Sequence, residues 1–136
     1  MDTAAAYKTP TPTEDTEQIM LFRWAEWQSG KYPSLRLMYH IPNGGKRGKA
    51  EAGRFKAMGV KAGVPDICLP VPKNVYAGLY IEMKRQRGGT VSQAQKEWVH
   101  DLRAEGFAVE VCKGWEDAAK VILDYLEGRY KPLYQP

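Results

Sequence analysis

The 136-residue chain is poor in the side chains that most often bind metals through sulfur or imidazole, and it has no long apolar run. Its two cysteines, Cys68 and Cys112, form no Cys-x-x-Cys pair, and its two histidines, His40 and His100, lie far apart. A structural zinc site is therefore not expected. No run approaches the roughly 20 apolar residues of a membrane span, and no basic segment followed by an apolar one opens the chain. We expect no membrane association, reduced cysteines and a cytoplasmic location.

A phosphate-binding P-loop is also missing, because the glycines and basic residues from Gly44 to Lys49 lack the Gly-Lys-Ser/Thr ending. The sequence does hold enough chain for one compact domain, with 43% hydrophobic residues. We expect a flexible segment over residues 1–12, one domain over 13–128, and a tail over 129–136 that contains two tyrosines and two prolines.

Positive charge is concentrated in two stretches, although the net charge is only +4. Residues 46 to 61 contain one acidic residue, Glu51, and six basic ones: Lys46, Arg47, Lys49, Arg54, Lys56 and Lys61. The second stretch consists of Lys84, Arg85 and Arg87. Clustered positive charge with glycines between is typical of a surface that contacts a phosphate backbone. The alternative is an ordinary solvated surface that happens to be basic.

Hydrophobic periodicity and breaker residues divide the chain into eight elements. They are a helix over 13–28, a strand over 35–41, a helix over 50–58, strands over 67–71 and 79–84, a helix over 92–105, a strand over 107–112 and a helix over 115–126. This order predicts an α/β fold in which helices cover the faces of a mixed β-sheet.

The first helix carries an acidic residue on its inward face. Asp15 and Gln18 have the spacing of a capping box. The expected apolar face consists of Met20, Leu21, Trp24 and Trp27. Glu17 lies four and seven residues before Leu21 and Trp24, so it points the same way. A first-turn glutamate commonly just favours the helix dipole, but this inward direction also makes Glu17 a candidate metal ligand or ligand-orienting group.

The centre of the chain places charges where strands usually bury apolar groups. Asp66 precedes the 67–71 strand, and Glu82 and Lys84 share one face of the 79–84 strand because side chains alternate. If the two strands pair, Asp66 comes near Glu82. Two carboxylates and the main-chain carbonyl of Met83 suit Mg²⁺ or Mn²⁺, which would activate a water and offset the charge of a phosphodiester. Lys84 would position the attacking water or stabilise developing charge.

A Glu-x-Lys sequence alone has an ordinary explanation, a salt bridge between strands. The combination is more specific, since an aspartate after a proline, an inward glutamate on an earlier helix and basic flanks accompany it. Together these features indicate a phosphodiester hydrolase beside a surface that holds the polymer.

Five spaced blocks carry a resemblance to a known family. They are Glu17-Gln18, Ile41 to Gly45, Gly59 to Asp66, Leu79 to Lys84, and Ser92 to Trp98. In this order they resemble the VRR-NUC branch of the PD-(D/E)XK nuclease superfamily, over about residues 15–126. The resemblance implies a restriction-endonuclease-like fold with an αβββαβ core, here with an extra helix after Gly45. Stand-alone members are typical of phages and bacteria, which implies the cytoplasm of a bacterium or of a phage-infected host cell.

The resemblance also implies roles for individual residues. The residues it assigns to catalysis are Glu17, Asp66, Glu82, Lys84 and Gln95. Those at the metal are Asp66, Glu82, the Met83 carbonyl, and Glu17 indirectly or through water. Gln95 would reach the site from its helix, although the capping-box spacing with Ser92 offers a second role for the same side chain.

Contacts with DNA are expected from the basic stretches and from the end of the 35–41 strand. The candidates are His40, Asn43, Lys46, Arg47, Lys49, Arg54, Lys61, Arg85 and Arg87. A histidine at a strand end is also often structural.

These features point to an endonuclease that depends on Mg²⁺ or Mn²⁺ and hydrolyses phosphodiester bonds. Similarity to Holliday-junction resolvases implies a homodimer acting on branched or structured DNA, in repair or recombination. Two alternatives stay open. One is a non-catalytic nucleic-acid-binding module whose carboxylates form salt bridges only. The other is a nicking or restriction-type nuclease on ordinary duplex DNA.

Overall fold

The computed structural model describes residues 10–42 and 48–136 of the chain. In chain order the elements are α1 (Glu14–Gln28), the 3-10 helix η2 (Pro33–Leu37), β1 (Tyr39–His40), α2 (Lys49–Ala57), β2 (Ile67–Leu69), β3 (Leu79–Lys84), α3 (Gln93–Ala104), β4 (Ala108–Lys113) and α4 (Trp115–Leu126). The expected α/β fold, a mixed sheet with an αβββαβ core and an extra helix, is confirmed.

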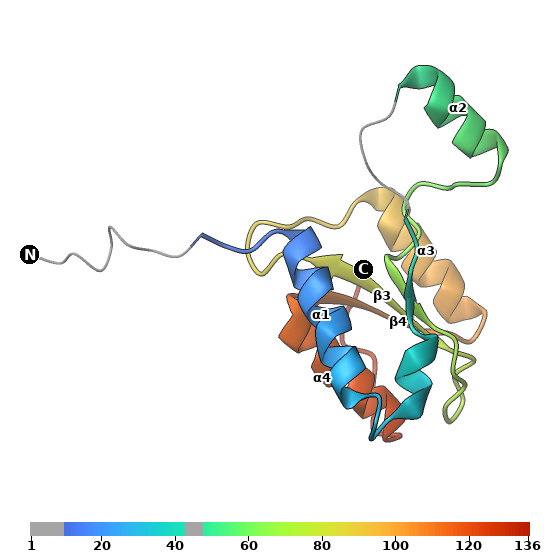
Figure 1. Cartoon of the computed structure of the whole chain (residues 1–136). Coiled ribbons are helices and arrows are strands. Elements are labelled where there is room, and N and C mark those ends of the chain that lie inside the picture. The colour runs from blue at the N-terminus through green and yellow to red at the C-terminus, as the bar shows by residue number, and fades with distance from the viewer. Residues whose placement is uncertain (1–9, 43–47) are drawn as a thin grey trace, which may run out of the picture.

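The sheet has the strand order β1-β2-β3-β4. β2 pairs antiparallel with both β1 and β3, whereas β3 and β4 run parallel. α1 and α4 pack side by side on one face of the sheet, and α3 packs against the other face (Figure 1). Because a parallel pair needs a crossover connection, α3 is the element that joins β3 to β4.

Strand β3 separates two kinds of side chain onto the two faces. Leu79, Ile81 and Met83 enter the core shared with α1 and α4, where each is almost fully buried. Burying an apolar side chain of this size contributes about 1.5–3 kcal/mol, so this face fixes the register of the strand. Glu82 and Lys84 consequently project toward α3. Burial of the apolar face of β3 therefore determines the direction of Glu82 and Lys84, the two charged residues that the sequence singled out.

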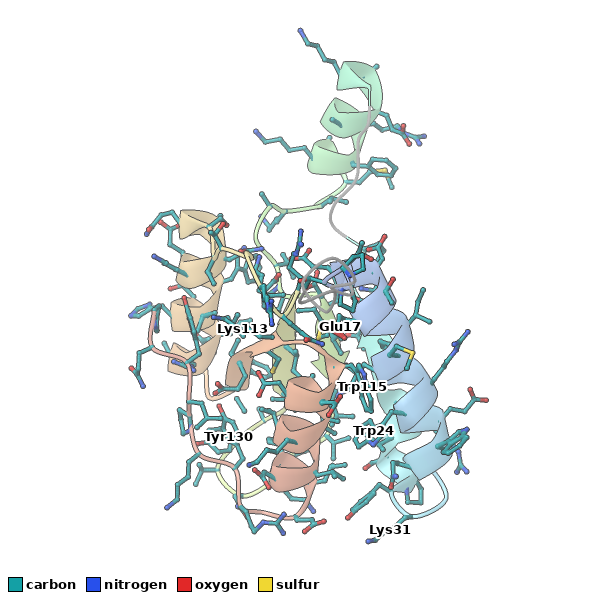
Figure 2. The ribbon with its side chains drawn as sticks, turned by 90° about the vertical axis from the view of Figure 1, so that its left-hand side faces the viewer. Glu17, Trp24, Lys31, Lys113, Trp115 and Tyr130 are labelled. Atoms are coloured by element: carbon teal, nitrogen blue, oxygen red, sulfur yellow. The ribbon has the colours of Figure 1, made fainter. Side chains whose placement is uncertain are left out.

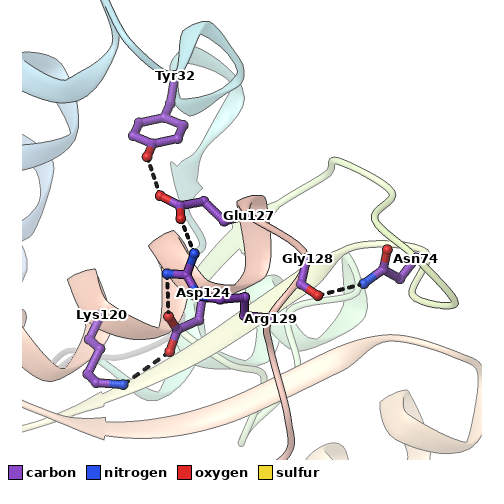
Figure 3. A network of polar contacts seen from close by, with 7 residues as sticks. All are labelled: Tyr32, Asn74, Lys120, Asp124, Glu127, Gly128 and Arg129. Atoms are coloured by element: carbon purple, nitrogen blue, oxygen red, sulfur yellow. Dashed lines mark hydrogen bonds and ion pairs between the residues drawn. The ribbon is translucent and has the colours of Figure 1, made fainter.

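The C-terminal end of α4 is tied to two loops by an exposed polar network (Figure 3). Tyr32, which precedes η2, donates a hydrogen bond to Glu127. Arg129 forms ion pairs with both Glu127 and Asp124. The amide of Asn74 donates to the Gly128 carbonyl at 3.1 Å. Exposed pairs of this kind contribute little individually, but together they join the ends of α4, η2 and the β2–β3 loop.

The tail after α4 packs on the body of the protein through a residue that the sequence had not singled out. Glu110 in β4 is almost fully buried. Its carboxylate accepts hydrogen bonds from the buried Tyr130 hydroxyl and from the Leu133 and Tyr134 N–H groups. Arg103 of α3 forms an ion pair with the same carboxylate at 3.3 Å. These four partners compensate for the cost of burying the charge.

The prediction of a strand over 35–41 is wrong for most of that range. Pro33 opens η2, a 3-10 helix that buries Leu35, and only Tyr39 and His40 pair with β2. β2 is also shorter than expected, since it ends at Leu69 instead of residue 71. Pro70, which follows, has no N–H to continue the ladder.

Two details of the first helix also differ from expectation. Its N-cap is Thr13, whose hydroxyl accepts the Thr16 N–H at 3.1 Å, and not Asp15. Trp27, expected on the apolar face, is 89% exposed, and Met20 is exposed as well. Glu17 and Leu21 are buried as predicted, and Ala25 is buried with them, so the buried positions recur every four residues.

Candidate active site

The pairing of β2 with β3 brings the two candidate carboxylates together. Ile67 lies opposite Ile81 in the antiparallel ladder, so Asp66 lies opposite Glu82. The Asp66 Oδ2 atom accepts the main-chain N–H of Met83 at 2.8 Å. This bond ties the start of β2 to the strand residue that stands between Glu82 and Lys84.

Glu82, Lys84 and Gln95 form a connected polar group between β3 and α3. Lys84 Nζ donates to Gln95 Oε1 at 3.0 Å and lies 3.5 Å from Glu82 Oε2. Gln95 Nε2 donates to the same Glu82 oxygen at 3.1 Å. Gln95 also closes the capping box of α3, accepting the Ser92 N–H at 2.9 Å. A single amide therefore serves both the helix terminus and the charged pair.

Burial makes Glu82 an unusual carboxylate. Only 3% of the residue is exposed. Burial, and next the negative charge of Asp66, raise the pKa of Glu82 to about 8, against a smaller opposing effect of Lys84. Glu82 Oε1 is buried and has no hydrogen-bond partner among the described residues. Glu82 therefore retains a proton near neutral pH, and an ionised Glu82 at this position requires a neighbouring cation.

A divalent cation fits this donor set. The described residues contain no group of three or more His, Cys, Asp or Glu side chains that would hold a metal by themselves. Mg²⁺, however, is commonly bound by one or two carboxylates together with water and substrate phosphate. Asp66, Glu82 and the Met83 carbonyl offer oxygen only, the preference of Mg²⁺ and Mn²⁺. A cation beside the unpartnered Glu82 Oε1 would compensate for the burial of this oxygen.

The main chain of Asp66 is held from the β1 side. Its carbonyl accepts the Ile41 N–H at 2.6 Å and lies 2.8 Å from His40 Nδ1. Because a carbonyl only accepts, His40 carries its proton on Nδ1 in this contact. The sequence had placed His40 near substrate, and the structure gives it this structural contact one residue from the β2 strand.

The segment before Asp66 is held by α3. The Trp98 indole Nε1–H donates to the Ala62 carbonyl at 3.0 Å. Gly63 has a φ of +87°, and a Cβ there would lie 2.7 Å from the Ala94 carbonyl carbon. Glycine is therefore required both for the backbone conformation and for the close approach. Sequence reasoning noted this segment but not its contact with α3.

Glu17 is held at a different place, the start of α4 (Figure 2). Only 2% of the residue is exposed. Its two carboxylate oxygens accept the Gln86 amide at 3.0 Å and the Trp115 N–H at 3.4 Å. A Cβ at Gly114 would lie 2.9 Å from Glu17 Oε2, so glycine leaves room for the carboxylate. Glu17 thus accepts one of the free N–H groups at the start of α4, a helix that has no side-chain cap of its own.

The candidate DNA contacts lie on several segments of the chain. Arg85 and Arg87 are exposed in the loop that follows β3, Lys49 and Arg54 are exposed on α2, and Lys61 is exposed between α2 and β2. Asn43, Lys46 and Arg47 lie outside the described residues.

Comparison with known proteins identifies the family. The VRR-NUC domain model matches residues 13–116. A solved structure named "VRR_NUC domain protein" is 33% identical and superposes with a TM-score of 0.76, over 93% of this chain and 98% of that chain. No curated protein matches the sequence. Across residues 10–42 and 48–136, every helix is too short or too polar to cross a membrane. The domain is of nuclease type, and the chain belongs to the VRR-NUC family.

Proposed function

We propose that this protein is a metal-dependent endodeoxyribonuclease that hydrolyses phosphodiester bonds of branched or structured DNA. The observation that carries the proposal is Glu82, a buried carboxylate with one unpartnered oxygen, beside Asp66 and Lys84. Such a group costs stability, and groups of this kind cluster at functional sites, where the reaction uses them. Membership of a nuclease-type family supports the same reading.

The residues of the site divide the work. Asp66 and Glu82, with the Met83 carbonyl, would hold Mg²⁺ or Mn²⁺, which supplies Lewis-acid activation of water and neutralises phosphate charge. Lys84 would donate a hydrogen bond to the attacking water or to the developing phosphate charge. Gln95 orients both Lys84 and Glu82 through its amide.

Glu17 would support this arrangement indirectly. Gln86, to which it is hydrogen-bonded, follows Lys84 by two residues. By holding Gln86 and the start of α4, Glu17 would fix the path of the chain as it leaves the catalytic strand. This makes it a positioning residue.

Several mostly basic residues would hold the DNA backbone. The proposed contacts are His40, Asn43, Lys46, Arg47, Lys49, Arg54, Lys61, Arg85 and Arg87. The charges of the lysines and arginines among them favour phosphate in a sequence-independent way. We further propose that the protein acts as a homodimer that cuts two strands symmetrically, in the cytoplasm of a bacterium or of a phage-infected cell.

The test is cleavage of a four-way junction, a flap and a linear duplex with Mg²⁺, Mn²⁺ or EDTA. The Asp66→Ala variant should lose cleavage of all three while DNA binding is largely retained. The matched control is Asp101→Ala, an exposed aspartate on α3, which should cut as the wild type does. If Asp66→Ala cuts equally well, the assignment is wrong.

The same assay separates the alternatives. Binding that weakens with salt, without cleavage under either metal, would identify a non-catalytic nucleic-acid-binding module. Equal cutting of the linear duplex and the junction would identify a nicking or restriction-type nuclease.

A further inference from the structure

Helix α2 stands away from the rest of the described chain (Figure 1). It has nine residues, and none of them is buried. Gly48 caps its start, and Gly59, with a φ of +101°, follows its end. Isolated helices this short are marginal in water, because nucleation is costly and few hydrogen bonds follow it. Contact with the surface of a partner would therefore stabilise α2.

The charge on this arm, defined as residues 49–61, indicates what that surface is. It carries four cations, Lys49, Arg54, Lys56 and Lys61, and one anion, Glu51, so its net charge is 4 − 1 = +3. All four cations are exposed, and none takes part in an ion pair within the described residues. Exposed cations with no carboxylate partner among the described residues match a polyanion better than an apolar partner.

The base of the arm is anchored beside the candidate active site. Residues 62–65 alone separate the arm from Asp66, whose carbonyl accepts the N–H of Ile41. On the returning side, Trp98 holds Ala62. The arm thus extends from the edge of the sheet that carries a candidate metal ligand. The helix itself is about 13 Å long, the rise of about four base pairs of DNA.

We propose that the arm grips the phosphate backbone of a DNA segment separate from the stretch that lies at Asp66 and Glu82. This inference rests on the proposed nuclease function. The arm makes the enzyme favour DNA that extends past the bond it cuts, either a long flank or a second duplex limb. A second copy of the chain is the less suitable occupant, because two arms meeting across a two-fold axis would bring +3 against +3.

The experiment measures DNA binding without divalent ions, by fluorescence anisotropy between 50 and 200 mM salt. The variant is Lys49→Gln/Arg54→Gln/Lys56→Gln. The matched control, Lys31→Gln/Arg36→Gln/Lys131→Gln, removes three exposed cations outside the arm; Lys31 lies at the opposite end of the molecule from α2 (Figure 2). The probes are duplexes of about 10 and about 30 base pairs, one and three helical turns.

The expected result follows from counterion release. Affinity falls as salt rises, so the slope of log affinity against log salt is negative. Loss of three phosphate contacts should make this slope on the long duplex less steep by about 2.7, at about 0.9 per contact. The wild type should bind the long duplex more tightly than the short one by a larger factor than the arm variant does. The charge-conserving variant Lys49→Arg/Lys56→Arg should keep the wild-type slope, and thermal unfolding should show that all variants fold.

Two results would overturn the inference. One is an arm variant whose salt slope and length preference equal those of the matched control. The other is sedimentation in which the arm variant loses a dimer that the wild type and the control form without DNA, with an unchanged salt slope, because the occupant would then be a second copy. Failure of the wild type to cleave with Mg²⁺ or Mn²⁺ would instead refute the nuclease function, since the binding measurements involve no cleavage.

Discussion

Replacing Glu82 by Gln should stabilise the metal-free protein at pH 8 and remove its response to divalent metal. The substitution keeps the shape of the side chain and an oxygen for Gln95 and Lys84, but it removes the buried charge. The amide nitrogen would take the place of the unpartnered Oε1 and could donate to Asp66. The Glu82→Gln substitution therefore measures how much the ionised Glu82 carboxylate lowers the free energy of unfolding.

The magnitude follows from the pKa of Glu82. Burial and Asp66 raise this pKa from 4.5 to about 8. At about 1.4 kcal/mol per pKa unit, the difference corresponds to no more than about 5 kcal/mol. Below pH 4.5 the side chain is protonated in both folded and unfolded chains. Between pH 4.5 and 8 the unfolded chain releases the proton while the folded protein retains it, so stability falls as pH rises through this window.

The assay is urea unfolding of the wild type and Glu82→Gln in EDTA at pH 5 and pH 8, repeated with Mn²⁺. In EDTA the two proteins should have similar free energies of unfolding at pH 5, and the variant should be more stable at pH 8. Mn²⁺ at 100 times its dissociation constant should stabilise the wild type at pH 8 by about 2.7 kcal/mol and the variant far less. An exposed control, Glu26→Gln, should behave as the wild type.

Two outcomes would refute this reasoning. If wild type and Glu82→Gln show the same pH dependence in EDTA, the folded protein does not retain the proton. If Mn²⁺ stabilises both equally, Glu82 is not a metal ligand.

Two further substitutions test the contacts that hold the site and the tail. Gly63→Ala should destabilise the protein by about 1–3 kcal/mol and lower cleavage, because the new Cβ meets Ala94 at 2.7 Å. Gly59→Ala, where φ is also positive but nothing lies within 4 Å, should cost less in urea unfolding, and an equal cost would contradict the steric argument. Tyr130→Phe should cost about 1.5–3 kcal/mol because buried Glu110 loses a hydroxyl donor, and a cost below 0.5 kcal/mol would show that the tail does not depend on this bond.

The sequence predicts β3 and α4 with the bounds that the structure shows, because each has strong local signals. Alternation and a following basic loop define Leu79–Lys84, and Gly114 and Gly128 flank Trp115–Leu126. The capping box of Ser92 with Gln95 is likewise a local pattern and is confirmed. The proximity of Asp66 and Glu82 also followed from the sequence, because an antiparallel pair with a short connection admits few registers.

What the sequence could not predict depends on partners far along the chain. The 35–41 alternation resembles a strand, but Pro33–Leu37 form a 3-10 helix and only Tyr39 and His40 pair with β2. Glu110 lies on the same face as buried Ala108 and Cys112, which alternation could have revealed. Its hydrogen-bond partners come from a tail some twenty residues later, and no local pattern announces them.

Gln95 illustrates why such a site is difficult to divide into structural and chemical parts. The sequence left two roles open for this side chain, a helix cap or a group that reaches the site. In the structure Oε1 accepts from the Ser92 N–H and from Lys84 Nζ, while Nε2 donates to Glu82. The cap fixes the position of the amide, and the amide then fixes the separation of lysine and carboxylate on the neighbouring strand. The start of α3 consequently positions Lys84 and Glu82. Any substitution at Gln95 should therefore perturb both the cap of α3 and the geometry of this pair.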